Sequence, residues 1–169
     1  EKYKNDGTRV WTVNGQTQLG LGVADPGDTG GGAIAVDYMG GVVYVVNKDA
    51  STIKKISVVG GIGPETPVVS DFVNYGTLYS GEGGVAGVAV DKNFNVYTIN
   101  FGWGAVKNVV RKFAPDGTLQ DVLVNEMLID NTQTNSSLIN PAFESITVDG
   151  DGNVYMLTCQ GPGGLFKVT

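Results

Sequence analysis

The residues that could do chemistry in this sequence are few. The chain contains no histidine, which excludes Ser-His-Asp and Cys-His nucleophilic schemes and any histidine-ligated metal. Cys159 is the single cysteine, so it has no partner for a disulfide within the chain. With no histidine base to activate its thiol, we interpret Cys159 as a small buried residue on a strand. The chemistry that remains belongs to carboxylate and amide oxygens.

Three residues with acceptor oxygens lie at equivalent positions before three similar segments, each counted back from the aspartate that the segments share. They are Asp28, Glu82 and Asn140. Oxygen ligands of this kind suit Ca²⁺ or Mg²⁺, so these residues are the candidate metal ligands, with Ca²⁺ as the cofactor they would favour. We favour the interpretation that all three are solvated turn residues and that the protein has no cofactor, and the metal site is the alternative.

The three similar segments form an internal repeat. Each copy has a small-aliphatic run that ends in aspartate, then a run containing Val-Tyr, and then an apolar-basic run. The first runs are Ala33–Asp37, Gly87–Asp91 and Ser145–Asp149; the second are Val42–Val45, Asn95–Thr98 and Asn153–Met156; the third are Ile53–Ile56, Val110–Phe113 and Leu165–Val168. Alternation, β-branched residues and Gly/Asn/Asp punctuation predict that all of them are strands.

The repeated aspartates are Asp37, Asp91 and Asp149. An aspartate after a strand suits a turn, because its side chain accepts hydrogen bonds from the backbone N–H groups that follow. We therefore expect a structural role for all three. The alternative is a catalytic set of three carboxylates, which we do not favour because equivalent positions in separate repeats are expected to lie well apart.

This pattern resembles the NHL repeat of β-propellers. The resemblance implies an all-β fold with one four-stranded blade per repeat, packed around a central axis. The chain would then be a single module of residues 1–169. Its blades would cover about 31–80, about 84–138, and about 141–169 completed by an outer strand within 1–19.

The two ends of the chain predict how such a ring would close. Lys2–Thr8 has the same form as Lys112–Thr118, which joins a third strand to a fourth, so the residues after Thr8 read as an outer strand. The last repeat stops after its third strand. Because propellers have about four to eight blades, we expect two chains to form a six-bladed ring, each N-terminal strand completing the other chain's last blade as a clasp. The alternative is that the chain is a section of a longer propeller polypeptide.

The loop after the second strand of the middle repeat differs from its counterparts. It carries two aromatic residues between glycines, Phe101 and Trp103, next to Asn100. Aromatic residues are favoured anchors at interfaces, so these three residues are the candidate contacts for a protein or glycan partner. The alternative is that the aromatics pack over a neighbouring blade. The outer connections 60–80 and 117–138 are also longer than an ideal blade needs.

Composition narrows the class of protein. The 26 glycines suit an all-β chain with many turns, and a net charge of −6 with no basic cluster argues against nucleic acid as a partner. No apolar run is long enough for a membrane helix. Removal of a signal peptide, truncation, or a partly read sequence would each explain the absence of an initiator Met. The first of these and the sequon at Asn135 fit the extracellular location that we expect. We expect a non-enzymatic binding or structural scaffold of the kind found in extracellular or virion assemblies. The alternative is a metal-dependent hydrolase like the gluconolactonase-type propellers.

Overall fold

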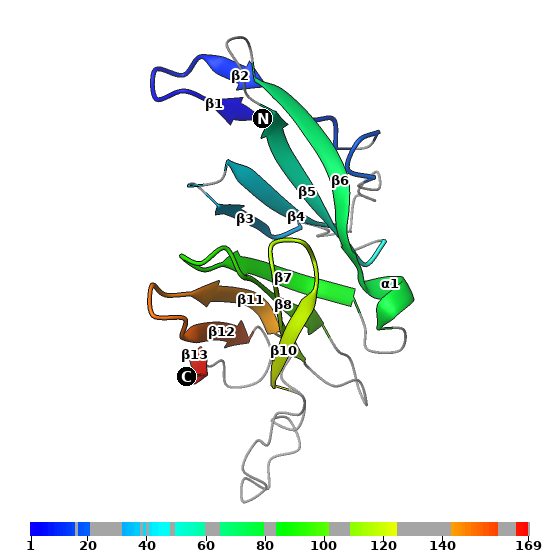
Figure 1. Ribbon diagram of the computed structural model, residues 1–169, viewed down its shortest axis with the longest axis vertical. Coiled ribbons are helices and arrows are strands. Elements are labelled where there is room, and N and C mark those ends of the chain that lie inside the picture. The colour runs from blue at the N-terminus through cyan, green and yellow to red at the C-terminus, as the bar shows by residue number, and fades with distance from the viewer. Residues whose placement is uncertain are drawn as a thin grey trace, which may run out of the picture.

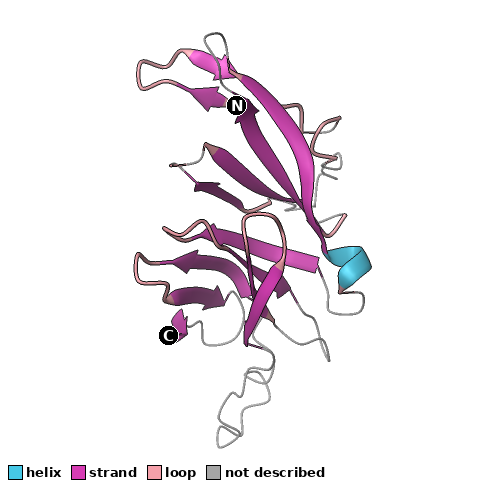
Figure 2. Ribbon diagram, viewed as in Figure 1, coloured by secondary structure: helices cyan, strands magenta, loops and turns pink. Residues whose placement is uncertain are grey.

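The protein is described by a computed structural model. It describes residues 1–15, 17–20, 32–37, 39, 41–47, 50–59, 65–79, 84–101, 109–124, 143–158 and 165–168. Within these residues the regular secondary structure is β-strand, apart from a single one-turn helix, and turns and loops join the strands (Figure 2). None of the described helical residues forms a segment that is long and apolar enough to span a membrane.

The described strands form antiparallel sheets whose strand order follows the chain. An N-terminal hairpin consists of β1 (Lys2–Tyr3) and β2 (Arg9–Trp11). The first four-stranded sheet consists of β3 (Ile34–Asp37), β4 (Val42–Asn47), β5 (Thr52–Val59) and β6 (Thr66–Asn74), followed by α1 (Tyr75–Leu78). The second consists of β7 (Gly84–Val90), β8 (Val96–Phe101), β9 (Val110–Phe113) and β10 (Leu119–Val124). The last, three-stranded sheet consists of β11 (Phe143–Val148), β12 (Val154–Thr158) and β13 (Leu165–Val168).

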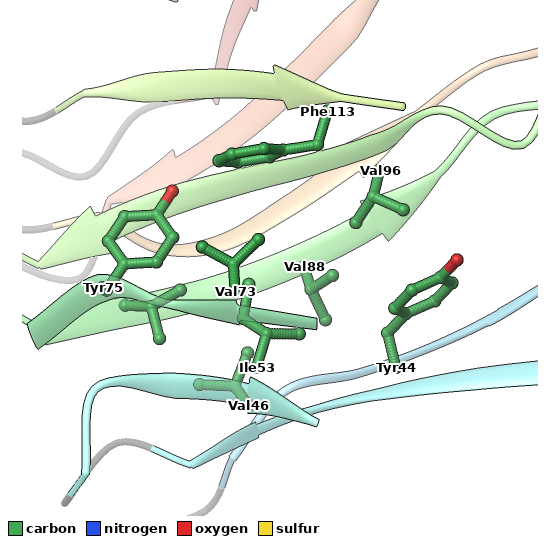
Figure 3. Close-up of a cluster of buried hydrophobic side chains, with 9 residues drawn as sticks. Tyr44, Val46, Ile53, Val73, Tyr75, Val88, Val96 and Phe113 are labelled. Carbon is green, nitrogen blue, oxygen red and sulfur yellow. The ribbon is translucent and has the colours of Figure 1, made fainter. Parts of the chain in front are cut away.

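The sheets stack face to face in chain order, from the N-terminal hairpin at one end to the three-stranded sheet at the other (Figure 1). A hydrophobic cluster fills each space between them. The cluster between the first two large sheets contains Tyr44, Val46, Ile53, Val73, Tyr75, Val85, Val88, Val96 and Phe113 (Figure 3). The next contains Ala86, Ala89, Tyr97, Ile99, Val110, Ile146, Val154 and Met156, and a smaller one under the hairpin contains Val13, Leu19 and Ile56.

Each second strand uses both of its faces, because side chains alternate along a strand. In β8, Val96 packs toward the preceding sheet, whereas Tyr97 and Ile99 pack toward the following one. In β4, Tyr44 and Val46 likewise face the following sheet, and Val43 lies beside the N-terminal segment. Each of these sheets therefore has two surfaces. The preceding-facing surface lies toward the sheet before it in the chain, and the following-facing surface lies toward the sheet after it.

The predicted strands are confirmed as an all-β arrangement. The connection 60–80 is less irregular than expected, since it contains β6 and α1, and the connection 117–138 contains β10. The clasp stays a prediction: β2 pairs with β1, and β13 pairs with β12 alone among the described strands. The hairpin and β13 lie at opposite ends of the stack (Figure 1), so β2 could complete the last sheet only in another chain.

Candidate functional site

The repeated aspartates organise the turns between the first and second strands. The Asp91 Oδ1 atom accepts hydrogen bonds from the backbone N–H groups of Asn93 and Asn95, both at 2.8 Å. Its Oδ2 atom accepts from Asn95 Nδ2 at 2.7 Å and from the Tyr97 hydroxyl at 3.1 Å. The predicted structural role of this aspartate is confirmed.

Asp149 repeats the same geometry one sheet later. Its Oδ1 atom accepts from the N–H groups of Asp151 and Asn153, and its Oδ2 atom accepts from Asn153 Nδ2 and the Tyr155 hydroxyl, all within 2.8–3.0 Å. In the first repeat, the Asp37 Oδ1 atom accepts from the Met39 N–H at 3.1 Å. All three aspartates thus bind their own turns.

Hydrogen bonding lowers the pKa values of the Asp91 and Asp149 carboxyl groups. The Asn153 side chain is the largest contributor that lowers the pKa of Asp149, which falls from 3.8 to about 2. For Asp91, burial raises the pKa, but the hydrogen bonds from Asn95, Asn93 and Tyr97 together bring it below its ordinary value. Both groups are therefore anionic acceptors at neutral pH and poor candidates for a general acid.

The turns of the three aspartates open onto one surface pocket, each from its own sheet. Asp37, Asp91 and Asp149 line one pocket of about 200 Å³, together with Met39, Lys92, Phe94 and neighbouring valines. They share this pocket because each lies at the end of the first strand of its sheet, and those ends lie on the same side of the stack. Among the described residues, however, no group of three acidic, cysteine or histidine side chains could hold a metal ion.

Two of the candidate partner-binding residues, Asn100 and Phe101, are the last two residues of β8, before the loop that leads to β9. Asn100 is fully buried, its Oδ1 atom accepts a hydrogen bond from the Val109 N–H, and its own N–H donates to the Val109 carbonyl at 3.3 Å. Asn100 therefore closes the base of this loop. Phe101 ends β8, while Trp103 lies outside the described residues, as do the candidate metal ligands Asp28, Glu82 and Asn140 and also Cys159.

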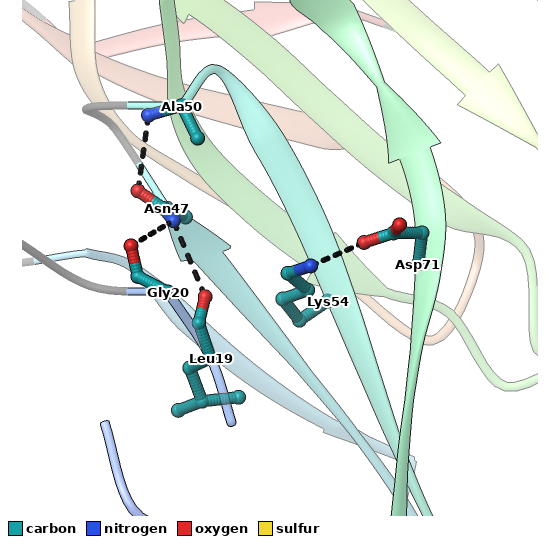
Figure 4. A network of polar contacts seen from close by, with 6 residues as sticks. All are labelled: Leu19, Gly20, Asn47, Ala50, Lys54 and Asp71. Atoms are coloured by element: carbon teal, nitrogen blue, oxygen red, sulfur yellow. Dashed lines mark hydrogen bonds and ion pairs between the residues drawn. The ribbon is translucent and has the colours of Figure 1, made fainter. Parts of the chain in front are cut away.

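Asn47 performs the equivalent task in the first sheet (Figure 4). Its Oδ1 atom accepts from the Ala50 N–H at 3.1 Å, and its Nδ2 atom donates to the carbonyls of Leu19 and Gly20 at 3.2 and 2.8 Å. Nearby, Lys54 forms an ion pair with Asp71 across β5 and β6. Sequence reasoning missed this role of Asn47, although the shared position of Asn47 and Asn100 at the end of the second strand was a signal for it.

The two ends of the stack expose apolar positions that are buried inside it. Ile34, Val88 and Ile146 occupy one repeat position on the preceding-facing surface; Ile34 is 65% exposed, whereas its counterparts are 4% and 7% exposed. On the following-facing surface, Leu165 is 70% exposed, and its counterparts Ile53 and Val110 are at most 1% exposed. The difference arises because, among the described elements, no sheet lies beyond the three-stranded one and the N-terminal hairpin leaves β3 uncovered.

The N-terminal segment covers only part of its end of the stack. A pocket of about 580 Å³ remains between this segment and the first sheet. Its lining is mainly apolar and includes Trp11, Val13 and Leu19 on one side and Ile34, Val36, Val43, Val45, Ile56 and Val58 on the other. The hairpin lies beside the outer part of the sheet, so the inner strand β3 is left open.

This stack of antiparallel sheets, each built outward from its first strand, is a β-propeller-like all-β fold. Several solved structures share it. The chain is similar to one from the crystal structure of a nidogen/laminin complex, with a TM-score of 0.50 and 19% identity over 75% of this chain and 38% of that chain. It is also similar to a luciferin-regenerating enzyme, with a TM-score of 0.54 and 12% identity over 81% of this chain and 44% of that one.

A third similar structure is regucalcin from Agrobacterium tumefaciens, described as a calcium-binding protein. Its TM-score is 0.50, with 15% identity over 74% of this chain and 36% of that chain. The chain therefore spans less than half the length of each of these proteins. No family model and no curated protein matches it. At these identities the likeness describes the fold alone.

Proposed function

We propose that this chain is an NHL-like propeller module that works as a non-enzymatic binding or structural scaffold. In this proposal its three repeats are three blades of a ring, and the ring is completed by association with further blades. The resulting rigid body presents its loops to a protein or glycan partner outside the cell.

The observation that carries this proposal is the exposure of Ile34 and Leu165 at positions that the same repeat buries elsewhere. Burying a large apolar side chain stabilises a protein, and large contiguous apolar surfaces on soluble proteins mark sites of association. The end surfaces also carry apolar residues at the positions where the interfaces between neighbouring sheets carry them. Association through them would continue the packing already present between neighbouring sheets.

The association can be tested by sedimentation velocity on matched variants. Leu165→Asp places a charge on an end surface, whereas Leu78→Asp places one at a similarly exposed leucine, 63% accessible, on α1. We expect the wild type and Leu78→Asp to sediment as an assembly and Leu165→Asp to lose it. Identical sedimentation of all three proteins as single chains would contradict the proposal.

The loop that carries Phe101 and Trp103 is the proposed contact for the partner. Its support is the buried Asn100, which bonds to Val109, the residue before β9, and so joins the two ends of the loop. A glycan array compares the wild type with Trp103→Ala. Loss of glycan binding without a change in the circular-dichroism melt supports a contact role, and a large drop in melting temperature assigns Trp103 to packing instead.

The alternative activity, a metal-dependent hydrolase that uses Asp28, Glu82 and Asn140, lacks a supporting contact because these residues lie outside the described part of the chain. Under the scaffold proposal, calcium and EDTA leave the melting temperature unchanged. A rise of several degrees with calcium that Glu82→Gln abolishes would favour the hydrolase.

A further inference from the structure

The N-terminal hairpin is an incomplete copy of the outer half of a sheet. Lys4 and Thr8 close its turn with the same backbone hydrogen bonds that Ala114 and Thr118 make between β9 and β10. In both turns an aspartate also accepts from the N–H two residues later, Asp6 from Thr8 and Asp116 from Thr118. The hairpin therefore corresponds to β9 and β10, and β2 corresponds to an outer strand.

The pairing registers of the two hairpins agree. In the second sheet, Phe113 lies opposite Leu119, and Lys112 lies opposite Asp121. In the N-terminal hairpin, Tyr3 lies opposite Arg9, and Lys2 lies opposite Trp11. Both ladders skip one residue of the outer strand. The equivalence of β2 and β10 thus extends to individual residues.

The last sheet supplies the part that the hairpin lacks. It contains first, second and third strands, and β13 is an edge strand among the described elements. Val168 lies opposite Val154 as Phe113 lies opposite Val96. Since Tyr3 is the counterpart of Phe113 in the N-terminal hairpin, Val168 and Tyr3 occupy the same position in the repeat. β13 and β1 are therefore alternative neighbours for β2.

Resting on the proposed function, we propose that the partner at both end surfaces is a second copy of this chain and that β13 of one chain pairs with β2 of the other. In this pairing β13 displaces β1, placing Val168 opposite Arg9 and Lys167 opposite Trp11. The last sheet of each chain covers Ile34 and Val36 of the other. Two such contacts close a ring related by a two-fold axis.

Three observations favour this occupant. The exposed following-facing residues, Leu157 and Leu165, correspond to Ile99 and Val110, which pack directly against the next sheet inside the chain. The pocket beside Ile34 and Val36 lies where the inner strands of such a sheet would stand. The exposed Lys2 and Tyr3 hold β1 only weakly, since their side-chain partners Glu65 and Glu1 lie at the surface.

Disulfide trapping tests the register directly. In a Cys159→Ser background, Arg9→Cys combined with Val168→Cys places two thiols opposite each other across the proposed junction, within reach of a disulfide. The control pair is Arg9→Cys with Lys167→Cys, in which the second side chain points to the other face of the strand. We expect mild oxidation to shift most of the test pair, and little of the control, to a two-chain band.

A mixing experiment tests the choice of surfaces without introducing cysteines. Ile34→Asp damages one end surface and Leu165→Asp damages the other; both positions are exposed in the single chain, so each variant should fold. In the proposed ring, each variant alone carries the damage at both contacts, whereas a mixed pair keeps one contact intact. We expect native mass spectrometry to detect mixed pairs in excess over pairs of either variant with itself.

These outcomes separate the inference from the proposed function. Association of the wild type without selective trapping of the Val168 pair, or growth beyond two chains, overturns the ring and leaves the scaffold proposal intact. A protein that remains a single chain under all conditions overturns both.

Discussion

Both carboxylate oxygens of Asp91 and of Asp149 accept hydrogen bonds within one turn. The Oδ2 atom of each aspartate also accepts a hydrogen bond from the tyrosine hydroxyl of the next strand. Burial and the bond to Asp91 raise the pKa of Tyr97 to about 12. At the residue scale, therefore, the most conspicuous titratable groups of the repeat connect turns to strands. Their chemistry is structural, because every described contact of these carboxylates lies within the turn or the adjacent strand.

The lowered pKa of Asp149 predicts how acid affects stability. Since the folded-state pKa, about 2, lies below the ordinary value of 3.8, the ionised carboxylate stabilises the fold above pH 3.8. This contribution is lost as pH falls from 3.8 toward 2. We expect Asp149→Asn to lower the urea midpoint at neutral pH and to reduce its decline across this window. Asp151→Asn, at an exposed neighbour, is the control, and equal effects of both variants would contradict the assignment.

Asn100 gives a second prediction at this scale. Asn100→Ala removes the acceptor of the buried Val109 N–H, and an unsatisfied buried group costs about 1–3 kcal/mol. We expect the free energy of unfolding in urea to fall by that amount. Asn93→Ala, at an exposed side chain, should change it by less than about 0.5 kcal/mol. A neutral Asn100→Ala would mean that the loop base does not depend on this amide.

At the element scale, the repeat predicted the strands well. The alternation around each Val-Tyr pair and the aspartate turn placed β3, β4, β7, β8, β11 and β12, because one residue pattern determines both faces of a central strand. The nine-residue β6 and the helix α1 were less visible in the sequence. Thr66–Asn74 at the sheet edge has mixed polarity, and α1 depends on Asn74 accepting from the Thr77 N–H, which is a local contact.

The equivalent turns at Gly7 and Gly117 provide a matched pair of variants. Both glycines adopt left-handed φ values, +83° and +92°, where an alanine is strained by roughly 1–2 kcal/mol. A Cβ at Gly7 would meet no atom within 4 Å, but one at Gly117 would lie 2.8 Å from the Phe72 carbonyl. We expect Gly117→Ala to destabilise the protein clearly more than Gly7→Ala in urea unfolding. Equal losses would mean that β6 does not pack on this turn as described.

At the scale of the whole molecule, the sequence predicted the β-propeller-like class, whereas the complementarity of the two ends stays a prediction. The sequence could not predict which apolar residues remain exposed, since Ile34 and Leu165 look like core residues by type and are exposed only because the stack ends there. The shared pocket of the three aspartates was also unforeseen. Its formation depends on how closely neighbouring sheets approach at their inner strands, which no single repeat encodes.

The candidate site was partly within reach of the sequence. The aromatic pair stood out by its contrast with the other loops, and its contact with a partner, like that of Asn100, stays a prediction. The anchoring role of Asn100 follows from its burial and its contact with Val109. Asp28, Glu82 and Asn140 remain predictions. Their segments lack the alternating pattern that made the strands predictable.

The central claim is that the end surfaces of the stack are covered when the protein functions. Multi-angle light scattering on the wild-type chain over a wide concentration range tests this claim most directly. We predict a constant mass near twice the 17.7 kDa of one chain, as expected for a closed ring. A mass of one chain at every concentration would contradict the account, because Ile34, Leu157 and Leu165 would then stay exposed to water.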